Sequence, residues 1–165
     1  MLPNFDFVLR SPAFTQGTRI PTRHTCDGAD LSPALTWTTP PAGTVSLALI
    51  CDDPDAPTPG AWVHWVIYDL APTLRGLPEG VPQQIQVAGA LTARQGPNTW
   101  PDGRVGYNGP MPPPGHGVHH YHFQLYALDR RLDLPPGADK AALKRAMSGH
   151  ILARTTLTGT YERKA

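Results

Sequence analysis

Cysteine is scarce in this sequence, and neither sign of charge dominates it. Its 165 residues include two cysteines, Cys26 and Cys51, with no C-x-x-C spacing. Two cysteines cannot form a disulfide framework, and whether these two ever pair stays open. The chain carries 14 Lys and Arg against 13 Asp and Glu, a formal net charge of +1, without a basic run or an acidic tail. Nucleic acid and anionic membranes are therefore poor partners on electrostatic grounds.

Long apolar segments are also missing. No run approaches the roughly 20 apolar residues of a membrane-spanning helix. The opening segment, residues 1–6, has neither the basic region nor the apolar region of a signal peptide. We therefore expect a cytoplasmic protein with no membrane span.

Proline and glycine, in contrast, are abundant. Twenty prolines and 16 glycines, with only 16% charged residues, would suit a disordered chain. Four Trp, five Tyr and four Phe, together with clear apolar strand patterns, argue against disorder. The length suits one domain over residues 1–165, large enough to bury a core. We interpret the chain as β-rich, with long loops stiffened by proline.

Apolar alternation predicts several strands. They span residues 5–9, 34–38, 45–51, 62–70, 118–128 and 156–162. In the strand over 62–70, alternation places these side chains on one face: Trp62, His64, Val66 and Tyr68. The opposite face is apolar as well, which is typical of a central strand, and both Trp62 and Trp65 are interpreted as core residues.

One helix is predicted near the C-terminus. Asp139 is a suitable N-cap for it. Its apolar positions are Leu143, Ala146, Met147, His150 and Ile151. Gly149 weakens the last turn of this pattern. The strands and the helix together predict a mainly β fold, an antiparallel, Greek-key-like β-sandwich of two sheets with a C-terminal α-helix.

The stretch from Cys51 to Leu70 is where the chemistry concentrates. An apolar strand runs directly into Asp53-Pro54-Asp55-Ala56-Pro57. Proline fixes φ, so this loop is stiff and holds its carboxylates in set directions. His64 follows on the returning strand, and we expect it beside the loop.

The main candidate site combines Asp53, His64, His119 and Tyr121. His119 and Tyr121 are two apart on one strand, so they point to the same side. Two imidazoles and a phenol are donors suited to an oxyanion, and an Asp beside a His favours the cationic imidazole that an anion requires. Asp53 would equally accept from an ammonium group of the same ligand. The alternative is that His64 and His119 are hydrogen-bonded core residues.

A second candidate site is the pair His120 and His122, with His116 as a third ligand. Two imidazoles two apart on a strand can chelate zinc, as in a metal-dependent hydrolase. Most such pairs, however, lie on a solvated strand face. No nucleophile signature such as G-x-S-x-G is present. The spacing of Asp53 and Asp55 favours loop architecture over acid–base chemistry.

A set of motifs in a fixed order covers nearly the whole chain. The most specific is Asp53-Pro54-Asp55-Ala56-Pro57. The others lie at residues 25–28, 31–33, 35–37, 62–65, 96–98, 106–110, 112–117 and 119–123. This ordered set resembles the phosphatidylethanolamine-binding protein family, in its bacterial, Raf kinase inhibitor-like branch.

The resemblance implies two antiparallel sheets, a C-terminal helix and a pocket for phosphate, acetate or a phospholipid head group. It also raises the question of a cis bond between Ala56 and Pro57. The sequence departs from the branch at Met111, where Cys is common, and at the insertion-like segment 99–105, which we expect to reshape the rim. Carried over to this sequence, the pocket residues are Asp53, His64, Pro112, His119 and Tyr121, with Asp55 and Tyr107 nearby.

We therefore expect a non-enzymatic protein that binds a small anionic or phosphorylated ligand without a cofactor. The same pocket would suit a phosphorylated or acidic segment of a regulated partner protein. A metal-dependent hydrolase and a loop-mediated protease or kinase inhibitor stay as alternatives, and homodimer formation stays open. The kinase-inhibiting role of eukaryotic relatives is not transferred, because a fold does not fix a function.

Overall fold

A computed structural model describes residues 6–165 of the chain. Its elements in chain order are β1 (Leu9–Arg10), η1 (Thr22–His24), β2 (Leu35–Trp37), β3 (Ser46–Asp53), β4 (Trp62–Leu70), β5 (Gly76–Leu77), β6 (Gln86–Val87), β7 (Ala93–Gln95), η2 (Pro101–Gly103), β8 (His119–Leu128), α1 (Lys140–Met147) and β9 (Ile151–Tyr161). All pairs of these strands are antiparallel.

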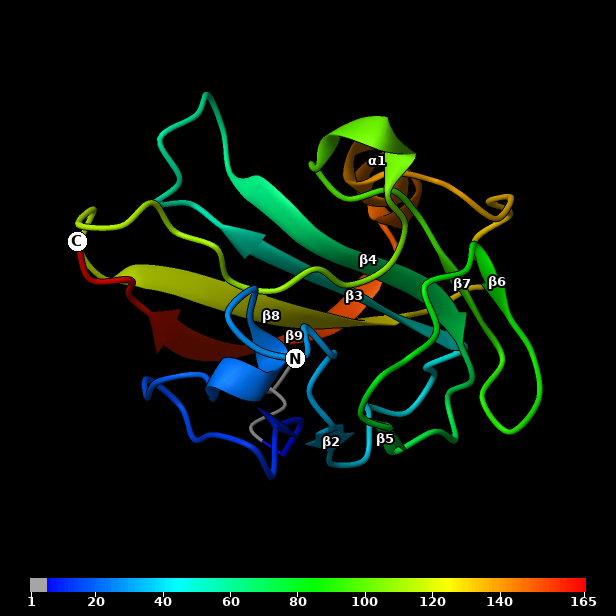
Figure 1. The fold of residues 1–165 in the computed structure, drawn as a ribbon. Helices are drawn as coiled ribbons and strands as arrows, with labels where there is room; N and C mark the ends of the chain where they lie inside the picture. Colours follow the sequence, from blue (N-terminus) through cyan, green and yellow to red (C-terminus); the bar gives the residue numbers. More distant parts are fainter. Residues whose placement is uncertain (1–5) are drawn as a thin grey trace.

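Within residues 6–165, the strands form two sheets and α1 is the one α-helix; Figure 1 shows their arrangement. The small sheet has the order β1-β2-β5, and the large sheet has the order β6-β7-β4-β3-β8-β9. Helix α1 lies on one face of the large sheet, and the small sheet lies on the other. The predicted mainly β fold, two antiparallel sheets with a C-terminal helix, is confirmed.

The core lies on both faces of the large sheet. All eight residues of β3 are buried. Leu47 and Leu49 pack toward the small sheet, whereas Ala48 and Ile50 belong to the cluster that includes Leu143 of α1. Burial on both faces explains why β3 and β4 are apolar at nearly every position. The prediction that residues 62–70 form a central strand is confirmed, since β4 lies between β7 and β3.

Strand register brings three strand ends together. Asp53, the last residue of β3, pairs with Trp62, the first residue of β4. Asp52 pairs with His122, close to the beginning of β8. The C-terminal end of β3 and the N-terminal ends of β4 and β8 therefore lie at the same end of the large sheet. The loop 54–61 and the loop before β8 meet at this end.

A β-bulge in β4 changes the direction of His64. Cys51 pairs with Trp65, but Asp52 pairs with Val63, so His64 is the extra residue. A bulge bends its strand and re-aims a side chain. His64 consequently packs against Tyr121, with ring centroids 5.1 Å apart. Tyr121 belongs to the cluster on the small-sheet side, so the predicted placement of His64 with Val66 and Tyr68 is wrong.

The C-terminal helix is shorter than the apolar spacing predicts. Asp139 is its N-cap and accepts a hydrogen bond from the Ala142 N–H (2.9 Å), as expected. The helix ends at Met147, because Gly149 has φ of +81° and takes the chain out of the helical region. His150 lies outside the helix, and Ile151 begins β9, so the closing strand starts five residues before the predicted residue 156.

Other expectations are also settled by the backbone. The first strand is Leu9–Arg10 instead of 5–9, and Phe5 lies outside the described residues. No cis peptide bond occurs among the described residues, so Ala56–Pro57 is trans.

The two cysteines, Cys26 and Cys51, are free thiols. Burial raises the pKa of both, to about 11 for Cys26.

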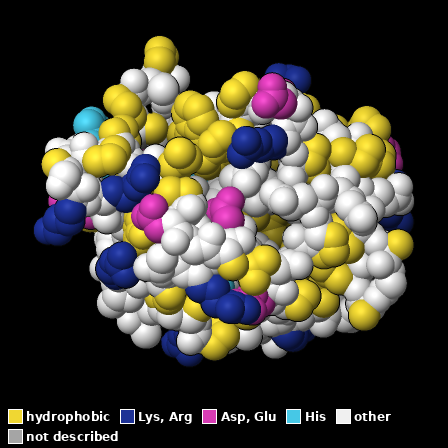
Figure 2. All heavy atoms as spheres, viewed as in Figure 1, with side chains coloured by type: hydrophobic (Ala, Val, Ile, Leu, Met, Phe, Trp, Pro, Cys, Tyr) yellow, Lys and Arg dark blue, Asp and Glu magenta, His cyan; other side chains and the backbone are white. Residues whose placement is uncertain are grey.

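Surface charge is mixed on the face seen in Figure 2. Lys, Arg, Asp and Glu side chains are scattered over this face, and hydrophobic side chains gather beside the tip of the loop between β3 and β4. Within residues 6–165, no helix has the length and apolar character needed to cross a membrane.

Candidate functional site

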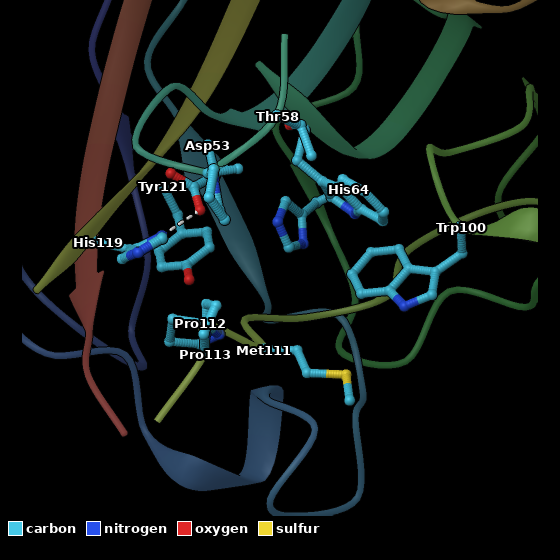
Figure 3. Close-up of a pocket in the computed structure, with 12 residues that line it drawn as sticks. Asp53, Thr58, His64, Trp100, Met111, Pro112, Pro113, His119 and Tyr121 are labelled. Atoms are coloured by element: carbon cyan, nitrogen blue, oxygen red, sulfur yellow. Dashed lines mark hydrogen bonds and ion pairs between the residues drawn. The ribbon is translucent and has the colours of Figure 1, made fainter. Parts of the chain in front are cut away.

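A cavity of about 260 Å³ opens where the ends of β3, β4 and β8 meet. Figure 3 shows Asp53, His119 and Tyr121 on one side and His64 with Trp100 on the other. The prolines of the two stiff loops complete the wall, from Pro57 on one loop to Pro112 and Pro113 on the other. The residues of the predicted pocket that line the cavity are Asp53, His64, Pro112, His119 and Tyr121.

Asp53 and His119 form a buried pair. Asp53 is 3% exposed and His119 is 1% exposed. The His119 Nδ1–H donates to Asp53 Oδ2 over 2.6 Å, and the backbone N–H of Asp55 donates to Asp53 Oδ1 over 2.7 Å. One carboxylate thus orients an imidazole of β8 and also fixes the beginning of the proline loop. The sequence leaves open which His lies beside Asp53, and the structure places His119 there.

His64 is held by the opposite loop. Its Nδ1–H donates to the carbonyl of Asn108 over 2.7 Å, and the N–H of Asn108 donates back to the carbonyl of His64 over 3.2 Å. Burial lowers the pKa of His64 below its ordinary value of 6.5, although the Asn108 carbonyl and the negative Asp53 act in the opposite direction. Because Nδ1 is engaged, Nε2 is the nitrogen left to meet a ligand.

Tyr121 contributes an unpaired hydroxyl. Its side chain is fully buried, yet its Oη has no hydrogen-bond partner within residues 6–165. Burial raises the pKa of Tyr121 well above its ordinary value of 10, so the group remains a neutral donor. Buried polar groups are nearly always paired, and an unpaired one in a cavity wall requires an explanation. A ligand that offers an acceptor supplies one.

An aromatic wall faces these polar groups. Trp100 lies in the segment 99–105 and packs edge-on against His64, with centroids 5.0 Å apart, and against Trp62, at 5.4 Å. Trp62 lines the cavity and is half-buried, so its interpretation as a core residue is wrong, whereas Trp65 is fully buried in the core. Met111 also lines the cavity and is 53% exposed. The cavity therefore has a polar end and an apolar wall.

Sequence reasoning missed Trp62 and Trp100 as individual cavity residues. A signal for Trp62 existed, because the residue directly follows the proline loop at the start of a strand. The segment 99–105 was expected at the rim, but nothing in its pattern singles out Trp100.

Two other residues of the predicted pocket lie outside this cavity. The Asp55 carboxylate accepts hydrogen bonds from the His120 N–H and from His120 Nδ1–H, both 2.8 Å. Burial acts to raise the pKa of Asp55, but these hydrogen bonds outweigh it and the pKa is lowered. Tyr107 lies in the core, where its hydroxyl donates to the carbonyl of His24 over 2.6 Å.

The three imidazoles of the alternative metal site have different partners. His116 Nδ1 lies 2.7 Å from His119 Nε2, His120 contacts Asp55, and His122 Nδ1 lies 2.8 Å from Thr158 Oγ1. Among residues 6–165, no group of three or more His, Cys, Asp or Glu side chains is arranged to hold a metal ion. The structure therefore does not bring His116, His120 and His122 together.

Comparisons with known proteins cover almost the whole chain. Residues 10–162 match the family model described as phosphatidylethanolamine-binding protein. A UPF0098 protein of Methanothermobacter thermautotrophicus is 50% identical over 157 residues, 94% of this chain and 98% of that protein. A Mycobacterium tuberculosis protein named as lipoprotein LppC is 40% identical over 94% of this chain and 72% of its own length.

Solved structures agree with the sequence matches. The Chlamydia trachomatis homologue CT736 has a TM-score of 0.84 and 40% identity, covering 96% of this chain and 98% of its own. Escherichia coli YbcL has a TM-score of 0.87 and 31% identity, covering 96% and 99%. Since the family model, the close relatives and the superposed folds all span nearly the full length, the chain belongs to the phosphatidylethanolamine-binding protein family.

Proposed function

We propose that this protein binds a small anionic or phosphorylated ligand in the cavity at the end of the large sheet, and that it acts by binding without catalysis. The observation that carries the proposal is the buried hydroxyl of Tyr121, unpaired within residues 6–165. Leaving a buried polar group unpaired costs about 1–3 kcal/mol. A bound anion would remove this cost by accepting from the hydroxyl.

The shape of the cavity narrows the ligand class. His64 and Tyr121 stand at the polar end, whereas Trp62, Trp100 and Met111 form a largely apolar wall. Within residues 6–165, the buried Nε1–H of Trp62 also has no hydrogen-bond partner. A volume of about 260 Å³ suits a small group. An anionic head joined to a short apolar or weakly polar part, as in a phospholipid head group, fits both features. The two oxygens of Asp53 already accept hydrogen bonds, so Asp53 acts mainly by orienting His119.

Removing one hydroxyl tests the proposal. Tyr121→Phe should weaken binding of O-phosphoethanolamine by at least about tenfold, because a hydrogen bond to a charged group contributes roughly 1.5–3 kcal/mol. The same variant should be as stable as the parent or slightly more stable when unliganded, since it loses a buried unpaired group. Calorimetric titration of chelator-treated protein measures the first effect, and thermal unfolding measures the second. Unchanged affinity would contradict the proposal.

Tyr68 offers a matched control. It is also fully buried, but its hydroxyl donates to the carbonyl of Pro135 and accepts from the Ala138 N–H. Tyr68→Phe should therefore lower the free energy of unfolding by about 1–3 kcal/mol and leave affinity unchanged. The two variants remove the same atom with opposite effects, which separates a ligand contact from a structural one.

Anion binding should depend on pH through His64. In the free protein its lowered pKa keeps the imidazole neutral near pH 7, with Nε2 as an acceptor. An anion at Nε2 favours the imidazolium and raises that pKa, so binding takes up a proton. Affinity should rise by up to about tenfold per pH unit as the pH falls, and should level off below the pKa of the free protein.

Sulfate is the appropriate probe for this prediction, because it does not titrate between about pH 8 and pH 5.5. Calorimetry in two buffers of different ionisation enthalpy counts the protons taken up. His64→Gln should abolish that part of the uptake. An affinity for sulfate that is independent of pH over this range would count against the assigned role of His64.

Two further expectations stay predictions, and homodimer formation stays open. The first is that the pocket would suit a phosphorylated or acidic segment of a partner protein. A cytoplasmic location also stays a prediction, because one relative carries the name lipoprotein. Nothing among the described residues favours the hydrolase or the loop-mediated inhibitor over anion binding.

A further inference from the structure

His119 has both ring nitrogens engaged. Its Nδ1–H donates to Asp53 over 2.6 Å, and its Nε2 lies 2.7 Å from Nδ1 of His116. His119 lines the cavity and belongs to the predicted anion site, yet within residues 6–165 each of its nitrogens already has a partner. A ligand that uses this imidazole must therefore replace one of the two contacts.

The two contacts differ in how firmly they are held. Asp53 and His119 are both buried, on β3 and β8, at the end of the large sheet. His116 is exposed and lies in the loop before β8, between Gly115 and Gly117, which have φ of +77° and +86°. Hydrogen bonds from the His116 N–H to the Pro113 carbonyl and from the Gly115 N–H to the Arg163 carbonyl hold the loop backbone. Rotation of the His116 side chain alone is enough to release His119.

The number of protons available makes His116 and an anion mutually exclusive partners of His119 Nε2. Two imidazole nitrogens at hydrogen-bond distance share a single proton. With Nδ1–H of His119 committed to Asp53, a neutral His119 accepts at Nε2 and His116 donates. An anion needs the reverse, a proton on His119 Nε2. The anion and the His116 ring therefore compete for the same nitrogen.

We propose that His116 is a gate residue that occupies His119 Nε2 in the ligand-free protein and is displaced when an anion binds. The inference rests on the proposed anion-binding function and adds the residue that regulates it. Ligands that offer an acceptor to His119 displace the ring. A neutral molecule that contacts only the aromatic wall leaves the ring in place.

Removal of the gate gives the main test. His116→Ala should bind O-phosphoethanolamine about three- to tenfold more tightly than the parent in calorimetric titration, because the ligand no longer replaces an existing hydrogen bond. His150→Ala is the control. His150 is also at the surface and hydrogen-bonded, to Asp129 at the other end of β8, and its removal should leave affinity unchanged. Because His116 is exposed and its side chain loses only this one hydrogen bond, the unliganded variant should unfold only slightly below the parent temperature.

The outcomes separate the gate from the binding function. If the parent binds and His116→Ala binds equally or more weakly, the gate is refuted and the anion site stands. If neither protein binds an anion, the proposed function is refuted as well. Imidazole ¹⁵N resonances give a second readout, since saturation with ligand should shift the His116 signals and leave those of His150 in place. Unmoved His116 signals at saturation would also refute the gate.

Discussion

Asp53→Ala should reduce the affinity for O-phosphoethanolamine by at least about 100-fold, which corresponds to roughly 2.7 kcal/mol. Removing a negative charge beside an anion would by itself favour binding. The structural role of Asp53 outweighs this effect, because its two oxygens hold the His119 ring and the beginning of the proline loop. Asp53→Ala also leaves the buried Nδ1–H of His119 without its acceptor, which costs about 1–3 kcal/mol of stability.

The neighbouring carboxylate provides the control. Asp55 is 41% exposed in its side chain and pairs with His120 at the surface. Asp55→Ala should change stability by no more than about 1 kcal/mol and affinity by less than about threefold. Asp53→Asn keeps the volume and one acceptor, so it should fold and still lose most of the affinity. Equal effects of the two alanine variants on binding would refute the assignment of Asp53 as the residue that organises the cavity.

Gly96→Ala should lower the free energy of unfolding by about 3 kcal/mol or more. A Cβ at this position would lie 1.6 Å from the carbonyl oxygen of Ala138 and 2.6 Å from its carbon. These atoms are backbone and belong to the segment that enters α1, directly before the N-cap Asp139. Neither the strand end nor the helix start can yield easily, so the new methyl group forces them apart.

Thermal unfolding measures this effect directly. For a chain of this length, about 3 kcal/mol corresponds to a decrease in Tm of roughly 6–12 °C. Gly60 is a suitable control, because a Cβ there meets nothing within 4 Å and only its φ of +78° opposes alanine. Gly60→Ala should cost about 1 kcal/mol. Similar Tm values for the two variants would show that the close approach of Gly96 to Ala138 does not prevent a side chain at position 96.

Local patterns in the sequence predicted the regular elements well. The strand 62–70 agrees with β4 at both ends, and β3 and β8 agree within a few residues. Apolar side chains on both faces of a strand indicate that both faces are buried, whichever strands or helices cover them. Asp139 was recognised as an N-cap because capping depends on one side chain and the next turn of backbone. Such signals are local, so they can be interpreted without knowledge of the fold.

The limits of the helix and the direction of His64 depended on longer-range effects. Apolar spacing continued to Ile151, but pairing of β9 with β8 takes that residue into the sheet at Leu128. Alternation placed His64 with Val66, but the extra residue in β4 aims it at Tyr121. A bulge is a property of two paired strands, and the pattern of one strand does not contain it.

The sequence by itself determined the residue types of the candidate site and the proline-rich loops that flank it. Asp53, His64, His119 and Tyr121 were identified from residue type, strand spacing and flanking prolines. Only the tertiary structure decided which groups face one another: Asp53 with His119, His120 with Asp55, and Trp100 beside His64. The physical reason is that side-chain type and strand period are encoded residue by residue. Contacts across a sheet depend instead on register, on a bulge and on where a distant loop packs.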